Sequence, residues 1–203
     1  MIDGLMKDYI DPLWERMAQP LVRAGLTPNQ VTALGLVLII LASAAYLWHQ
    51  SGLIFGLTLA VAFAFDALDG AVARQRDMRS KMGGYFDAMV DRYQELIVLA
   101  AIAWVTGLWA LALLAFSGAM ITSYAKARTA IEIPISNEAW PDFFERLERI
   151  IFLCLLLIAD GLIGAAWVMW VGLSIYAMLC HFTALQRARR AAAMLAEVDR
   201  RGE

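Results

Sequence analysis

The sequence predicts an all-α integral membrane protein, with six transmembrane helices in one bundle and an amphipathic helix at the N-terminus. First, 61% of the 203 residues are hydrophobic and only 18% are charged, whereas a soluble domain of this size needs more polar surface. Second, the apolar residues form long runs, such as Val31 to Trp48 and Ile150 to Cys180, and about 20 apolar residues cross the hydrocarbon core. Third, every Lys and Arg can be assigned to one side of the membrane.

Residues 1–28 are expected to form the interfacial amphipathic helix and the segment that leads into the membrane. Apolar residues recur here every three or four positions, with charged residues between them: Met6, Ile10, Leu13, Met17 and Leu21. Pro12 and Pro20 should bend this helix, and Trp14 should lie at headgroup depth. The segment lacks the continuous apolar core and the cleavage site of a signal peptide.

Residues 29–190 are expected to form one transmembrane domain, followed by a polar cytoplasmic tail at 191–203. The six spans are predicted at 31–50, 52–74, 84–106, 108–130, 146–163 and 165–188. Thr27 or Asn29 can cap the first of them. Gly52, Gly107 and Gly161 mark turns too short for a folded loop, so successive helices are antiparallel neighbours. The one sizeable loop, Glu132 to Asp142, is acidic.

The charges also predict the orientation of the protein in the membrane. With six spans both termini face the same way, and all Lys and Arg residues then fall on that side, which is the cytoplasmic side. We therefore expect a multi-pass protein of the cytoplasmic membrane with both termini in the cytoplasm. The net charge of −2 does not favour nucleic acid as a partner. Basic residues on the cytoplasmic side suit anionic membrane lipids.

Four aspartates at the cytoplasmic end are the strongest functional signal. Asp66 and Asp69 are three residues apart on the second span, and Asp87 and Asp91 are four apart on the third, so each pair lies on one helical face. Ionisable residues at membrane depth are costly unless they pair or bind something. Because four convergent carboxylates repel one another and offer only oxygen ligands, we expect two Mg²⁺ ions, for which Mn²⁺ can substitute.

The residues around the aspartates suit an anionic substrate. Gly70, Gly83 and Gly84 permit close approach of the backbone, Arg74 can grip a phosphate, and Ser80 offers a hydroxyl. Basic residues here can also serve as membrane anchors, which is the interpretation we prefer for Arg76 and Lys81.

The segment from Asp66 to Asp91 closely resembles the signature of the CDP-alcohol phosphotransferase family. The residues that match DxxDGxxARx8GxxxDxxxD are Asp66, Asp69, Gly70, Ala73, Arg74, Gly83, Asp87 and Asp91. The resemblance implies six spans with an interfacial helix, a homodimer, and a reaction in which an acceptor hydroxyl attacks a CDP-linked lipid and CMP leaves. Residues 29–190 would then be the catalytic domain.

The resemblance also implies individual roles. Asp66, Asp69 and Asp87 would hold the first metal, and Asp66, Asp87 and Asp91 the second, with Asp91 also the base that deprotonates the acceptor. The CDP group would contact seven residues: Asn29, Gln30, Val31, Thr32, Gly70, Arg74 and Ser80.

Basic residues at other cytoplasmic helix ends predict an acceptor that already carries a phosphate. We expect Lys126, Arg128 and Arg187 to bind it, whereas Arg146 and Arg149 can equally be membrane anchors. These segments look similar to the branch of the family that makes phosphatidylinositol phosphate or its archaeal ether-lipid counterpart, which implies inositol 1-phosphate as the acceptor. Glycerol 3-phosphate is the alternative within the enzyme class. A divalent cation channel or carrier is the alternative outside it, because carboxylates also line ion paths.

Overall fold

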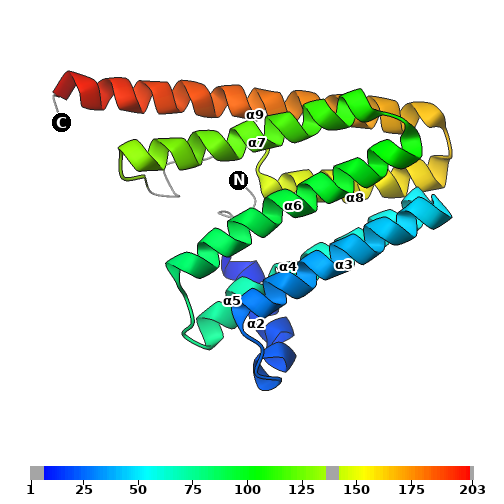
Figure 1. Ribbon diagram of the computed structural model, residues 1–203, viewed down its shortest axis with the longest axis horizontal. Helices are drawn as coiled ribbons and strands as arrows, with labels where there is room; N and C mark the ends of the chain where they lie inside the picture. Colours follow the sequence, from blue (N-terminus) through cyan, green and yellow to red (C-terminus); the bar gives the residue numbers. More distant parts are fainter. Residues whose placement is uncertain (1–6, 136–141, 202–203) are drawn as a thin grey trace.

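The protein is described here by a computed structural model that covers residues 7–135 and 142–201. The described residues form eight helices (Figure 1). Their bounds are α2 Lys7–Arg23, α3 Pro28–His49, α4 Gly52–Asp66, α5 Leu68–Gln75, α6 Lys81–Thr106, α7 Trp109–Glu132, α8 Arg146–Ile163 and α9 Ala166–Arg201. The prediction of an all-helical protein is confirmed for this part of the chain.

The long helices pack side by side in one bundle. Helix α7 lies along α9, α4 lies along α8, and α3 contacts both α4 and α6 (Figure 1). Their shared core is apolar and includes the stacked rings of Tyr46 and Phe55, whose centroids are 4.2 Å apart. Tight turns at residues 50–51, 107–108 and 164–165 join successive helices at one end of this bundle. The predicted antiparallel neighbours are therefore present.

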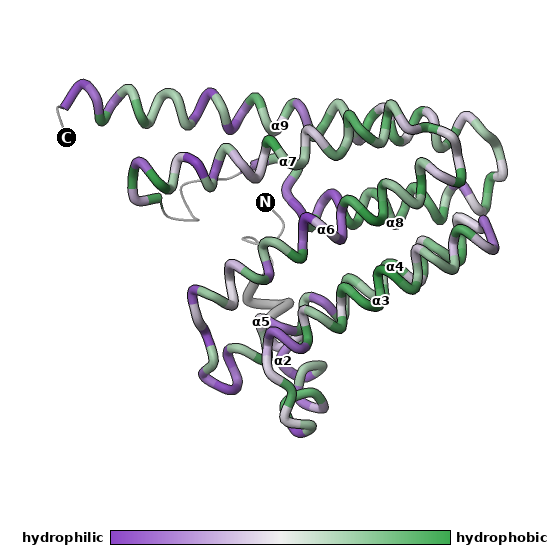
Figure 2. Tube along the Cα trace, in the orientation of Figure 1, coloured by the Kyte–Doolittle hydropathy of each residue, from purple (hydrophilic) through white to green (hydrophobic). Residues whose placement is uncertain are grey.

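Four helical segments are long and apolar enough to cross a membrane: Pro28–His49, Gly52–Gln75, Trp109–Glu132 and Ala166–Arg201. The other two predicted spans are also helical, as α6 and α8, but both carry several charged residues. The count of six spans thus stays a prediction. Figure 2 shows hydrophilic residues gathered at the end of the bundle where α5 lies and α6 and α8 begin.

The chain is interrupted at the first aspartate pair but not at the second. Helix α4 ends at Asp66 and α5 begins at Leu68, so only Ala67 separates the two helices. Helix α6 passes through Asp87 and Asp91 without a break. The link between α5 and α6 turns at Asp77, which has a left-handed backbone (φ 52°). This turn returns the chain so that α5 and α6 present their aspartates at the same end of the bundle.

One predicted turn glycine has a different role. Gly161 lies inside α8, which ends only at Gly164 (φ 65°). A Cβ on Gly161 would lie 2.2 Å from the backbone nitrogen of Leu53 on α4. The prediction of a turn at Gly161 was therefore wrong, because this glycine allows α4 and α8 to approach closely. Gly107 does occupy its predicted turn, with φ 75°.

The N-terminal segment forms α2, which packs on α5. Ala18 is buried there with Leu68, Ala71 and Val72, and Trp14 packs against this cluster. Leu13 is 56% exposed and lies on another face of the helix. The predicted apolar stripe is thus divided between two faces, because α5 covers only one of them. Location at a membrane interface stays a prediction.

Two other segments extend the sequence-based description. Helix α9 continues as far as Arg201, so residues predicted to form the tail prolong the last helix. In the predicted acidic loop, residues 136–141 lie outside the described residues. Asp142, the last residue of that loop, is buried.

Candidate active site

All four aspartates lie at the hydrophilic end of the bundle. Asp66 and Asp91 are buried, with 2% and 8% of their surface exposed, while Asp69 and Asp87 are half-buried. Asp66 and Asp69 both interact electrostatically with Asp87. The sequence prediction that the two pairs converge agrees with this arrangement. Like charges this close need compensating cations.

Asp66 is held by three elements at once. Its Oδ1 accepts a hydrogen bond of 2.9 Å from Gln94 Nε2 on α6, and its Oδ2 accepts one of 2.8 Å from Arg146 Nη2 on α8. On α3, a Cβ added to Gly35 would lie 2.6 Å from Asp66 Oδ1. Glycine is therefore required at position 35, since any side chain would displace the carboxylate.

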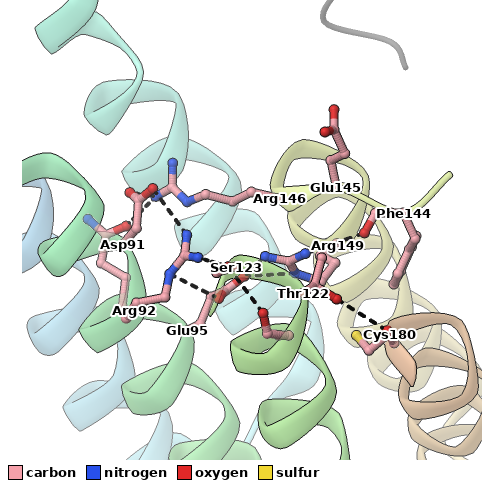
Figure 3. Close-up of polar contacts among 12 residues, drawn as sticks. Asp91, Arg92, Glu95, Thr122, Ser123, Phe144, Glu145, Arg146, Arg149 and Cys180 are labelled. Atoms are coloured by element: carbon pink, nitrogen blue, oxygen red, sulfur yellow. Dashed lines mark hydrogen bonds and ion pairs between the residues drawn. The ribbon is translucent and has the colours of Figure 1, made fainter. Parts of the chain in front are cut away.

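Arg146 supplies the compensating cation between the two buried aspartates. Its Nη2 lies 2.7 Å from Asp91 Oδ1 as well as 2.8 Å from Asp66 Oδ2. The same nitrogen also donates to Gln94 Oε1 at 2.6 Å. Figure 3 shows Arg146 extending from the start of α8 to Asp91 on α6. Of the two sequence interpretations, membrane anchor or pocket residue, these contacts favour the pocket.

Asp69 is oriented by groups next to it. Thr32 Oγ1 on α3 donates a 2.6 Å hydrogen bond to Asp69 Oδ2, and the backbone N–H of Gly70 donates to Oδ1. Thr32 was predicted to contact a nucleotide. Its hydroxyl instead contacts an aspartate while the residue lines the adjacent cavity.

A first cavity of about 410 Å³ opens beside Asp69 and Asp87. Among the predicted nucleotide contacts, those that line it are Asn29, Thr32, Gly70 and Ser80. Ser80 caps α6 by accepting a 2.9 Å hydrogen bond from the N–H of Gly83. The predicted glycine-rich surroundings are thus confirmed as a wall of this cavity. Arg79 also lines it and was missed, because an arginine in a polar turn resembles a membrane anchor.

Three predicted nucleotide contacts lie outside the lining of this cavity. Gln30 accepts a 2.8 Å hydrogen bond from the N–H of Thr27 and so completes the capping box of α3. Val31 is fully buried in the core. Arg74 lies near Glu15 on α2, with Nε 3.7 Å from Oε1. The tertiary surroundings of Val31 and Arg74 could not be predicted from the sequence.

A second cavity, of about 440 Å³, lies beside Asp91. It is lined by Asp91 and by five basic side chains from four helices: Arg92, Lys126, Arg146, Arg149 and Arg187. Lys126 and Arg187 are predicted acceptor residues. Arg128 does not line this cavity; it is half-exposed and pairs with Glu132 one turn further along α7.

Acidic partners hold most of these cations in place. Arg149 donates to Glu95 Oε1 from Nε (2.8 Å) and from Nη2 (2.6 Å), with both side chains 3% exposed. Arg92 hydrogen-bonds to Ser123 and lies 3.4 Å from Asp91 (Figure 3). Glu95 was not among the predicted site residues, although an ionisable residue inside a predicted span was a signal for it.

Arg187 and Lys126 differ in how they are held. Arg187 pairs with the buried carboxylate of Asp142, donates to Glu145 Oε1 at 3.1 Å and to the carbonyl oxygen of Thr122 at 2.7 Å. Lys126 forms no ion pair with any described residue. Its ammonium is therefore the cavity cation that an anionic ligand can engage without displacing a carboxylate.

The carboxylates fit a divalent metal by their donor chemistry. They offer only oxygen atoms, as Mg²⁺ and Mn²⁺ prefer. Asp91 Oδ1 is buried and accepts no hydrogen bond from the described residues, so its lone pairs are available to a metal ion. Within residues 7–135 and 142–201, no three such side chains form a ready metal-binding cluster. Arg146 lies between Asp66 and Asp91 and separates their oxygens.

Comparison with known proteins decides the family. The sequence model of the CDP-alcohol phosphatidyltransferase family matches residues 25–195, which is most of the chain. This chain belongs to that family. The CDP-alcohol phosphatidyltransferases are enzymes, so the channel or carrier alternative is set aside. The match covers both cavities and all four aspartates.

Several relatives are similar to the chain over most of its length. It is 33% identical over 193 residues to the archaetidylinositol phosphate synthase of Pyrococcus horikoshii, covering 94% of this chain and 96% of the relative. It is 31% identical over 191 residues to the phosphatidylinositol phosphate synthase of Mycobacteroides abscessus, covering 90% and 85%.

The fold is also that of a solved structure. The phosphatidylinositol phosphate synthase of Mycobacterium tuberculosis with CDP-DAG bound has a TM-score of 0.78 to this chain at 24% identity, covering 89% of this chain and 94% of that one. The same enzyme in complex with manganese and citrate also gives 0.78. At this identity the likeness establishes the shared fold.

Proposed function

We propose that this protein transfers the phosphatidyl group of a CDP-linked lipid, or the corresponding group of an ether lipid, to inositol 1-phosphate and releases CMP. The observation that carries the proposal is the pair of cavities that flank Asp87 and Asp91, one turn apart on α6. A donor in the first cavity, beside Asp87, and an acceptor in the second, beside Asp91, would then lie next to neighbouring carboxylates of one helix. The synthases named above, which are 31–33% identical to the chain, support the choice of acceptor.

The first cavity suits the CDP group of the donor. Asn29 and Ser80 offer polar side chains, and Gly70, Gly83 and Gly84 leave space for a diphosphate close to the backbone. Arg79 adds a positive charge. Asp66, Asp69, Asp87 and Asp91 would hold the divalent cations, two Mg²⁺ ions by resemblance to the family. When bound, these ions neutralise the diphosphate and polarise its phosphorus.

The second cavity suits a phosphorylated acceptor. Lys126 and Arg187 would hold the acceptor phosphate, and Asp91 lies in the wall of the same cavity. In the reaction, the acceptor oxygen bonds to the β-phosphorus, its proton passes to Asp91, and the bond from that phosphorus to CMP breaks. The leaving CMP keeps the electron pair. Orientation of the hydroxyl beside a carboxylate base contributes by proximity and by general base catalysis.

An acceptor assay tests the proposal. CMP release by the purified protein with Mg²⁺ would be measured with CDP-diacylglycerol and with its archaeal ether-lipid counterpart as donors. The acceptors would be inositol 1-phosphate, glycerol 3-phosphate, or none. We expect release with inositol 1-phosphate and one of the donors. CMP release with glycerol 3-phosphate alone would show that inositol 1-phosphate is not the acceptor. The absence of CMP release with every donor–acceptor pair would show that neither lipid is the donor.

The membrane setting belongs to the same proposal. We place the two cavities at the cytoplasmic face of a cell membrane, because basic residues concentrate at that end of the bundle. We also propose a homodimer, by resemblance to the family. Cysteine labelling in sealed cells at Ser80, against a position in the 107–108 turn, would test the orientation.

A further inference from the structure

We propose that Arg146 couples metal binding to acceptor binding, because its guanidinium is shared between the aspartates and the second cavity. This inference rests on the proposed function. In it, a divalent cation at the aspartates replaces Arg146 as the counter-charge. The released guanidinium then becomes a binding group for the acceptor phosphate.

The contacts of Arg146 show that one of its interactions is readily exchanged. Nη2 carries two hydrogens, yet three acceptor oxygens lie within 2.8 Å of it: Asp66 Oδ2, Gln94 Oε1 and Asp91 Oδ1. Hydrogen bonds join it to Asp66 and Gln94, whereas Asp91 Oδ1 receives none. The contact with Asp91 is therefore an ion pair without a hydrogen bond, and it is the contact that a metal ion would take over.

The Nε atom of Arg146 and the neighbouring Phe63 ring add little restraint. Arg146 Nε is buried and has no hydrogen-bond partner among the described residues. The guanidinium carbon lies 5.9 Å from the centre of the Phe63 ring, which restrains it only weakly. Arg149, by contrast, binds Glu95 through two nitrogens. Of these two neighbouring arginines, Arg146 is the one that can change partners.

The direction in which Arg146 can move follows from burial. Gln94 and Asp66 are 0% and 2% exposed and close off one side. The Arg146 side chain is 26% exposed and lines the second cavity. A guanidinium repelled by a divalent cation would therefore move toward the cavity that the acceptor phosphate would enter. Metal and phosphate should then each strengthen the binding of the other, as linkage requires.

The test measures Mn²⁺ affinity without turnover, from the electron paramagnetic resonance signal of free Mn²⁺. The purified full chain would be titrated with and without inorganic phosphate as the probe for the acceptor. In the wild type we expect phosphate to tighten Mn²⁺ binding by about tenfold, within the ~5- to 150-fold range typical of coupled sites. In Arg146→Gln we expect tighter Mn²⁺ binding without phosphate, because the competing cation is gone, and no further effect of phosphate.

Two control variants separate this role from simpler ones. Lys126→Gln removes a cation from the same cavity that forms no ion pair with Asp66 or Asp91, so it should weaken phosphate binding and leave Mn²⁺ affinity unchanged. Arg146→Lys keeps the charge and should restore part of the coupling. Coupling that persists in Arg146→Gln would mean that phosphate contacts the metal directly, and would overturn the inference.

The outcomes also distinguish the inference from the proposed function. A wild type that binds no Mn²⁺ would reject the metal site and the inference with it. A wild type that binds Mn²⁺ without any effect of phosphate would reject the inference alone, even if Arg146→Gln did not fold. Unchanged Mn²⁺ affinity in a folded Arg146→Gln variant would also reject the inference alone.

Discussion

The buried pair of Glu95 and Arg149 should be the most sensitive ionic contact in the bundle. Both side chains are 3% exposed, and two hydrogen bonds of 2.8 and 2.6 Å join them. Arg149→Met removes the cation that hydrogen-bonds to Glu95 and leaves this carboxylate in the core, with Arg92 Nε 3.7 Å away. Breaking one partner of a buried pair costs about 3–5 kcal/mol.

The expected shift in melting temperature is large. For a chain of this size, 1 kcal/mol corresponds to about 2–4 °C, so Arg149→Met should melt roughly 6–20 °C below the wild type. Thermal unfolding of the purified proteins in the same detergent would measure it. The double variant Glu95→Leu with Arg149→Met should regain most of this loss, since apolar side chains can replace a buried pair.

Arg128→Met is the matched control for this prediction. Arg128 pairs with Glu132 on the surface, where both side chains are nearly half exposed, and such pairs contribute about 0.3–0.5 kcal/mol. Its melting temperature should stay within ~2 °C of the wild type. If Arg149→Met shifts the melting temperature no more than Arg128→Met does, the buried pair does not stabilise the fold as we argue.

Three further predictions concern the aspartates. Asp69→Asn should abolish CMP release while its melting temperature equals or exceeds that of the wild type, because it removes a ligand and relieves repulsion; a folded variant with most of its activity would contradict the metal assignment. Thr32→Val removes the 2.6 Å hydrogen bond to Asp69 and should weaken Mn²⁺ binding ~10- to 100-fold, measured by titration; unchanged affinity would deny Thr32 that role. Gly35→Ala places a Cβ 2.6 Å from Asp66 Oδ1 and should destabilise the protein by about 1–3 kcal/mol; an unchanged melting temperature together with full activity would refute the close approach.

Much of the fold could be predicted because the signals are local. Apolar runs give α3, α4 and α7, and helical spacing places Asp87 and Asp91 on one face of α6. The break at Ala67 could not be predicted, since Ala67 and Leu68 are good helix formers. Gly161 was misassigned for a related reason: a glycine in a turn and a glycine between packed helices look alike in one sequence.

The candidate site was predicted unevenly. Of the seven residues expected to contact the CDP group, four line the first cavity: Asn29, Thr32, Gly70 and Ser80. Gln30 does not, because its side chain closes a capping box that involves only Thr27, three residues earlier. That capping box could have been predicted from the sequence, since Thr27 and Gln30 have the required spacing.

By itself, the sequence determined the apolar helices, the motif with its four aspartates, and the family to which they belong. Tertiary structure alone decided which arginine pairs with which buried carboxylate. Arg146 contacts Asp66 from 80 residues away, and Arg149 contacts Glu95 from 54 residues away. The reason is physical: helical period and hydropathy depend on neighbours within a few residues, whereas the partner of a buried charge depends on how separate helices pack.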